Sequence, residues 1–91
     1  MKTKLDEARE IINFVDKEMI SLFVKRMNAS KMVAEYKKEN NLPILDSQRE
    51  NALKEKNLKL LDNLELEQYY LIFFEGVLNA SKEYQKECLK K

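Results

Sequence analysis

The fold is decided by the first forty residues, of which residues 5–40 read LDEAREIINFVDKEMISLFVKRMNASKMVAEYKKEN. Apolar residues return every three or four positions, which is the spacing of one face of an α-helix. The segment Asn40-Asn41-Leu42-Pro43 ends this pattern, because the residue before a proline is pushed out of the helical conformation. We therefore predict one long helix that runs to about Asn40. Its apolar seam consists of Leu5, Ala8, Ile12, Val15, Met19, Leu22, Ala29, Val33 and Tyr36.

Two further helices are expected after the proline. The segment from Ser47 to Glu50 has the form of a capping box, and Asp46 could cap the same helix instead. This second helix carries few apolar residues, so it should be short and lie on the surface. The third should begin between Asn63 and Glu65, and its Gly76 should permit a close helix contact, since glycine there costs about 1 kcal/mol relative to alanine. No segment has strand character, and we expect an all-α fold of three helices in a single domain, residues 1–91.

The first helix is too long for a compact domain. About 35 residues at 1.5 Å per residue span roughly 50 Å, whereas a compact chain of this size has a diameter of about 30 Å. The helix must therefore extend beyond its own domain while its seam stays apolar. A monomeric hairpin would need a bend, and no residue in this helix favours one. We expect a second copy to cover the seam in an intertwined, two-fold homodimer.

The composition excludes several classes of function. The net charge is +1, which provides no broad basic field for nucleic acid or an anionic membrane. The chain has no histidine, one cysteine (Cys88) and one glycine, so a cysteine-based zinc site and a glycine-rich phosphate loop are excluded. No apolar run could span a membrane, and the N-terminal residues turn acidic too early for a signal peptide. We expect a cytoplasmic protein that needs no metal or other cofactor.

Four polar residues occupy positions where apolar residues are expected. Arg26 interrupts the seam of the first helix, and Lys37 lies eleven residues later on nearly the same face. Ser81 and Gln85 continue the apolar stripe of the third helix, four residues apart. Such groups could pair with carboxylates and carbonyls on neighbouring helices. Together they favour a polar pocket inside the bundle, because burying them without partners costs several kcal/mol.

A second group of polar residues opens the second helix. Asp46, Arg49 and Glu50 are, by themselves, typical of a cap with surface charges. Arg9 lies off the main seam and is, by itself, typical of a solvated charge. By themselves these residues do not indicate a binding site. Their interpretation depends on the order of all the motifs along the chain.

That order resembles the all-helical class of chorismate mutases. The resemblance extends from about Glu7 to Gln85, without a large insertion or deletion. It rests on Arg9 early in a long helix, then Lys25-Arg26, Tyr36-Lys37, the segment PILDSQRE at 43–50, and Ser81 with Gln85. It implies an isomerase that rearranges chorismate to prephenate in phenylalanine and tyrosine biosynthesis, without a cofactor and as a homodimer.

The resemblance also implies a role for each site residue. Arg9 would reach across the dimer into the other subunit's pocket and bind one substrate carboxylate. Arg26 would bind a carboxylate within its own subunit, with Arg49 and Ser81 supporting that end.

At the other end of the substrate, Lys37 would contact a carboxylate and the ether oxygen, to which Gln85 would also donate. Glu50, with the backbone of Asp46, would accept a hydrogen bond from the ring hydroxyl. Under this resemblance Lys37, Gln85 and Arg26 are expected to carry the catalysis.

Two other functions fit parts of the pattern. An isochorismate-pyruvate lyase shares the fold and the cationic residues, but its pattern lacks the Asp-x-x-Arg-Glu segment that contains Glu50. A non-catalytic helical dimerisation module would hold Arg26 in a structural ion pair, and Lys37→Met would then leave its function intact. A mutase domain that docks onto a larger enzyme of the same pathway is a further alternative.

Overall fold

The computed structural model describes residues 1–90, so Lys91, the last residue of the expected domain, lies outside the described residues. The described chain contains α1 (Lys4–Glu39), α2 (Ser47–Leu61), the 3₁₀ turn η1 (Leu64–Leu66) and α3 (Glu67–Leu89), with no strand. The expected all-α fold with three helices is confirmed. None of these helices is long and apolar enough to cross a membrane.

The helix α1 begins at a capping box that the sequence analysis did not identify. The backbone N–H of Asp6 donates to Thr3 Oγ1 and the backbone N–H of Thr3 donates to Asp6 Oδ2, both at 3.1 Å. These two bonds satisfy backbone groups that the first helical turn leaves unpaired. At the other end Asn41 takes a left-handed conformation with φ 53°. The helix ends at Glu39, as the proline signal predicted.

Of the two residues expected as possible caps of α2, Asp46 is the cap. The Asp46 side chain accepts a hydrogen bond of 3.0 Å from the backbone N–H of Arg49, while Ser47 is already the first helical residue. The capping-box assignment to Ser47 is therefore wrong, because the chain turns into the helix one residue earlier. No residue of α2 is fully buried, as expected for a surface helix. The start of α3 is later than expected, at Glu67, because Asn63 caps the intervening turn η1.

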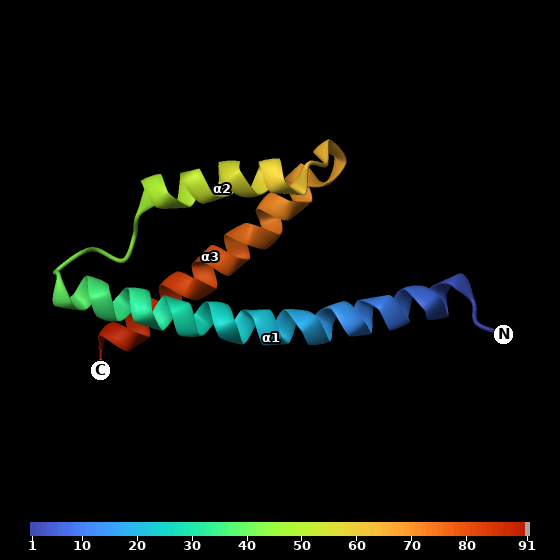
Figure 1. Ribbon diagram of the computed structural model, residues 1–91, viewed down its shortest axis with the longest axis horizontal. Helices are drawn as coiled ribbons and strands as arrows, with labels where there is room; N and C mark the ends of the chain where they lie inside the picture. Colours follow the sequence, from blue (N-terminus) through green and yellow to red (C-terminus); the bar gives the residue numbers. More distant parts are fainter. Residues whose placement is uncertain (91) are drawn as a thin grey trace.

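The helix α1 overhangs the rest of the molecule, as its length predicted. Figure 1 shows α3 crossing the C-terminal half of α1, while α2 runs back from the loop after α1 and meets α3 on the side nearer the N-terminus. The N-terminal part of α1 extends beyond this crossing. Both α1 and α2 pack on α3, and not on each other, within the described chain. The radius of gyration is 16.6 Å, compared with about 12 Å for a compact chain of this length.

The core of the single chain is small and partly polar. Its buried apolar residues are Ala34, Phe74 and Leu78, and its buried polar residues are Ser30, Ser81 and Gln85. Every residue of the seam expected along α1 is exposed in this single chain, and its cover by a second copy stays a prediction. The small side chains of Ser30 and Ala34 face α3 instead, and their size allows the two helices to pack closely.

Within its own chain, Gly76 makes no close helix contact of the kind expected of it. A methyl group added at its Cα would meet no atom within 4 Å in this chain. The position is exposed on α3. Within residues 1–90, therefore, no helix packing requires a glycine there.

Candidate functional site

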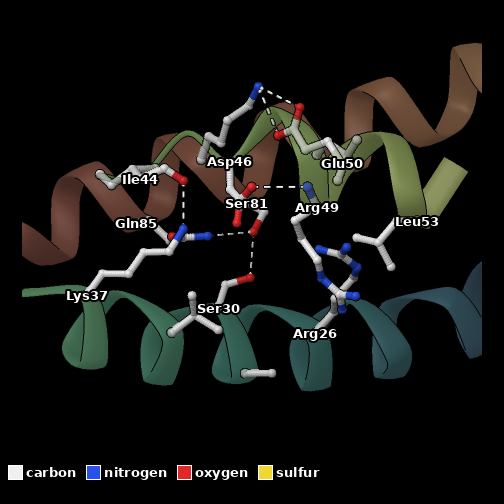
Figure 2. Close-up of a pocket in the computed structure, with 14 residues that line it drawn as sticks. Arg26, Ser30, Lys37, Ile44, Asp46, Arg49, Glu50, Leu53, Ser81 and Gln85 are labelled. Atoms are coloured by element: carbon white, nitrogen blue, oxygen red, sulfur yellow. Dashed lines mark hydrogen bonds and ion pairs between the residues drawn. The ribbon is translucent and has the colours of Figure 1, made fainter. Parts of the chain in front are cut away.

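A cavity of about 310 Å³ lies among α1, the loop after it, the start of α2, and α3. Figure 2 shows polar side chains converging on it from these segments. Four cations and two carboxylates line the cavity together with two serines and a glutamine, beside a few apolar walls. The polar lining consists of Arg26, Ser30, Lys37, Asp46, Arg49, Glu50, Ser81, Lys82 and Gln85.

Seven of the eight residues singled out from the sequence line this cavity, and Arg9 does not. Arg9 precedes Arg26 by seventeen residues, which separates them by about 25 Å along a helix. It is exposed in the half of α1 that extends beyond the rest of the chain. A single copy therefore does not bring Arg9 to the cavity.

A buried hydrogen-bond network joins α1 to α3 at the cavity. The hydroxyl oxygens of Ser30 and Ser81 lie 2.7 Å apart, and Gln85 Nε2 donates to Ser81 Oγ at 3.2 Å. All three residues are buried. Ser30 was missed by the sequence analysis although it lies four residues after Arg26, which places it on the same face of the helix.

The two ends of the Gln85 amide differ in whether they have a hydrogen-bond partner. Its Nε2 contacts Ser81, whereas its buried Oε1 has no hydrogen-bond partner within the described chain. The two ends of a carboxamide have nearly the same shape, so a half-turn exchanges them at little steric cost. After that turn the Ser81 hydroxyl donates to Oε1, and Nε2 is available as a donor to a bound molecule.

The ammonium group of Lys37 is held by the loop between α1 and α2. Its Nζ donates to the backbone carbonyl of Ile44 at 2.7 Å, as drawn in Figure 2. An ammonium group has three donors. One carbonyl therefore orients Lys37 and leaves further donors for another acceptor.

The guanidinium of Arg26 rests on an aromatic side chain. Its Cζ lies 5.8 Å from the centre of the Phe74 ring, a distance at which a cation is attracted to the ring face. Tyr70 stacks on Phe74 with ring centres 5.6 Å apart, and Asn57 Nδ2 donates to the Tyr70 hydroxyl at 2.9 Å. This stack supports Arg26 from the side of α3. Figure 2 shows the side chains of Arg26 and Arg49 turned toward each other across the cavity.

The cap and the first turn of α2 supply one carboxylate each. Asp46 acts as the helix cap. Glu50 lies 3.2 Å from Lys82 Nζ, in an ion pair that connects α2 to α3. Lys82 was not identified from the sequence, because its position depends on how α2 packs on α3 and not on any local pattern.

The remaining cations of the cavity have no carboxylate partner. Within residues 1–90, no ion pair involves Arg26, Lys37 or Arg49. This contradicts the alternative in which Arg26 and Lys37 pair with carboxylates on neighbouring helices of the same chain. Three cations near one cavity repel one another unless an anion lies among them. The arrangement suits a small molecule with more than one negative charge.

A profile of the chorismate mutase type II family matches residues 8–86. This chain belongs to the chorismate mutase type II family. The matched segment contains all eight residues singled out from the sequence, from Arg9 to Gln85. No solved structure matches the chain at a significant level.

Two relatives illustrate the range of chorismate mutase proteins that resemble this chain. A chorismate mutase of Methanocaldococcus jannaschii is 30% identical over 91 residues, which cover 99% of this chain and 92% of that protein. A bifunctional chorismate mutase/prephenate dehydratase of Buchnera aphidicola (subsp. Baizongia pistaciae) is 36% identical over 93 residues, which cover 100% of this chain. The chain spans only 25% of the length of that bifunctional relative.

Proposed function

We propose that this cavity binds chorismate and rearranges it to prephenate, in a site that Arg9 of a second copy completes. The observation that carries the proposal is the convergence of Arg26, Lys37 and Arg49, without carboxylate partners, beside the buried amide of Gln85. Chorismate carries two carboxylates, so it matches this excess of positive charge. A volume of about 310 Å³ suits a small molecule of this kind.

The reaction requires positioning and charge stabilisation from the protein. The rearrangement breaks a C–O bond while a C–C bond forms within the same molecule, so no nucleophile and no external base take part. Arginine clamps on the two carboxylates hold the substrate in its reactive, folded conformation. The planar fork of a guanidinium suits this task because it can bind both oxygens of a carboxylate.

Negative charge grows on the ether oxygen as the C–O bond lengthens. Lys37 and Gln85 are the donors we assign to that oxygen, since both reach the cavity from helices that the serine network joins. A donor of this kind typically contributes about 3–4 kcal/mol to the rate. The Ile44 carbonyl, which orients Lys37, limits the rearrangement needed when the substrate binds.

The ring hydroxyl of the substrate is assigned to the other wall of the cavity. Glu50 is the acceptor for it, with the backbone at Asp46 beside it. Arg49 and Ser81 support the carboxylate that Arg26 binds. These roles follow from the resemblance, and their support is that all of these side chains line one cavity.

A second copy of the chain is needed to bring Arg9 to the site. Large apolar side chains along residues 5–24 of α1 are each at least 41% exposed, and they are Leu5, Ile11, Ile12, Phe14, Val15, Met19, Ile20, Leu22, Phe23 and Val24. An apolar surface of this extent is typical of a protein interface. A hollow of about 470 Å³, lined by apolar side chains of α1 and α3 beside Arg26, offers room for a few apolar side chains of another subunit. We propose an intertwined homodimer in which each α1 carries its Arg9 into the other subunit's cavity.

The first experiment is to incubate the purified protein with chorismate and to identify the product. The proposal predicts prephenate from the wild type and a rate at least a hundredfold or so lower for Lys37→Ala. Lys31→Ala is the matched control, because Lys31 is an exposed lysine of α1 outside this cavity. If chorismate persists with the wild type, the mutase activity is refuted and isochorismate is the next substrate to test.

Prephenate formation belongs to aromatic amino acid biosynthesis, and we expect the protein to act in the cytoplasm. Fractionation of cells that produce the protein, followed by the chorismate assay on each fraction, tests this location. Activity confined to a membrane or secreted fraction would contradict it.

A further inference from the structure

An ion pair at the cavity has no role in the mechanism described so far. Lys82 Nζ lies 3.2 Å from Glu50 Oε2 and 3.5 Å from Glu50 Oε1, so it contacts both carboxylate oxygens. The two side chains are 22% and 17% exposed, and both residues line the cavity. The other ion pair between α2 and α3, Lys54–Glu75, is outside the cavity and has side chains that are 28% and 48% exposed.

We infer that Lys82 is a positioning residue for Glu50 and thereby determines the preference for substrates that carry the ring hydroxyl. This inference rests on the proposed function, in which Glu50 accepts a hydrogen bond from that hydroxyl. Lys82 itself touches neither the carboxylates nor the ether oxygen in this account. It acts on the substrate only through the carboxylate that it holds.

Glu50 needs such a partner because its side chain is flexible. A glutamate carboxylate rotates about three side-chain bonds, and fixing it for a hydrogen bond costs conformational entropy. A lysine on the neighbouring helix removes this cost before the substrate arrives, since the charge-assisted contact already orients both oxygens. A carboxylate has about four acceptor positions. The two contacts with Lys82 therefore leave positions that can accept the hydroxyl.

The expected effect concerns binding of the hydroxyl and not the bond rearrangement. The hydroxyl stays on the ring throughout the reaction, so its contact with Glu50 contributes equally before and in the transition state. Loss of such a contact raises KM and leaves kcat almost unchanged. A loose Glu50 should raise the KM for chorismate about tenfold, within the range found for small misplacements of site groups.

The experiment compares chorismate with an analogue in which hydrogen replaces the ring hydroxyl. Lys82→Met keeps the length of the side chain and removes its charge. We expect this variant to raise KM for chorismate about tenfold and to leave KM for the analogue unchanged within about twofold. Lys82→Arg retains a donor for the carboxylate, and its preference for chorismate should stay within about threefold of the wild type.

Lys54→Met is the matched control, because it breaks the other ion pair between the same two helices, at 2.9 Å, outside the cavity. It should leave both KM values unchanged. Circular dichroism and size-exclusion chromatography check that each variant is folded, and Lys82→Gln replaces Lys82→Met if that variant is not.

Three outcomes overturn the inference. If Lys82→Met raises KM equally for chorismate and for the analogue, Lys82 acts by its charge on the dianion and not through Glu50. If Lys54→Met changes the preference for chorismate over the analogue as much as Lys82→Met does, the Lys82–Glu50 ion pair only holds α2 and α3 together and does not position Glu50. If the wild type rearranges neither substrate, the proposed function itself fails, and this result is distinct from the other two because they require an active wild type.

Discussion

Ser30 and Ser81 are separated by 51 positions in the chain, yet their hydroxyl oxygens lie 2.7 Å apart. This hydrogen bond connects α1 to α3 beside the cavity, and both serines are buried. Because Gln85 donates to the same Ser81 oxygen, the position of the proposed catalytic amide depends on the packing of two helices.

Ser30→Ala should therefore destabilise the fold. The substitution removes one partner of a buried hydrogen bond, which costs about 1–2 kcal/mol in the free energy of unfolding. Urea denaturation of the variant and the wild type at equal protein concentration measures this difference. Ser47→Ala is the control, since Ser47 is exposed and is not the cap of α2. Equal stability of Ser30→Ala and the wild type would contradict the importance of this contact.

Gln85→Glu should make the activity depend on acid. The amide of the wild type does not titrate, so its activity should change little between mildly acidic and mildly alkaline pH. A carboxyl group at this position donates a hydrogen bond only while it is protonated. The rate of the variant should be highest at low pH and should fall as the pH rises through the pKa of the introduced group, to about a hundredth of the wild-type rate at neutrality.

The measurement for this variant is a pH–rate profile of chorismate consumption. Gln68→Glu, an exposed change on the same helix, serves as the control and should keep the flat profile. A flat profile for Gln85→Glu would exclude Gln85 as the donor to the ether oxygen.

Gly76→Ala should stabilise the protein. Nothing within 4 Å in the chain obstructs the added methyl group, and alanine favours a helix interior by about 1 kcal/mol over glycine. Thermal denaturation at several protein concentrations tests this expectation. A less stable variant that dissociates more readily would mean instead that a second subunit packs against Gly76.

The ion pair Lys54–Glu75 predicts a pH-dependent contribution to stability. The hydrogen bond and charge of Lys54 lower the pKa of Glu75 below its ordinary value. A lowered carboxyl pKa stabilises the folded state above the unfolded pKa, and this contribution is lost as the pH falls through the folded pKa. Lys54→Met should thus be slightly less stable than the wild type at neutral pH and equally stable in acid. Denaturant titrations at the two pH values compare them, and a difference that persists in acid would contradict the pairing.

The length and the C-terminal limit of α1 could be read from the sequence because they depend on local signals. The absence of glycine and proline before Pro43 and the apolar spacing were sufficient for its length and its C-terminal end. The cap of α2 could not be decided in the same way, since Asp46 and Ser47 are both good caps and only the path of the backbone distinguishes them.

The polar lining of the cavity was predictable where polar residues interrupt an apolar stripe, as Arg26, Ser81 and Gln85 do. Ser30 was not predicted, because a small polar residue in a helix does not visibly interrupt an apolar stripe. Its burial follows from the approach of α3. Lys82 was not predicted, because its contact with Glu50 depends on the packing of α2 against α3. Arg9 was singled out only through the resemblance to chorismate mutases, and its own chain gives it no contact with the cavity.

Mixing two variants tests whether one active site is built from two copies of the chain. Arg9→Ala and Lys37→Ala should each be nearly inactive as pure proteins. When the two are unfolded and refolded together in equal amounts, half of the dimers are mixed, and each mixed dimer has one intact site of two. The mixture should then regain about a quarter of the wild-type rate. If it stays as inactive as its components although mixed dimers form, Arg9 does not act in the other subunit's cavity and the shared site is refuted.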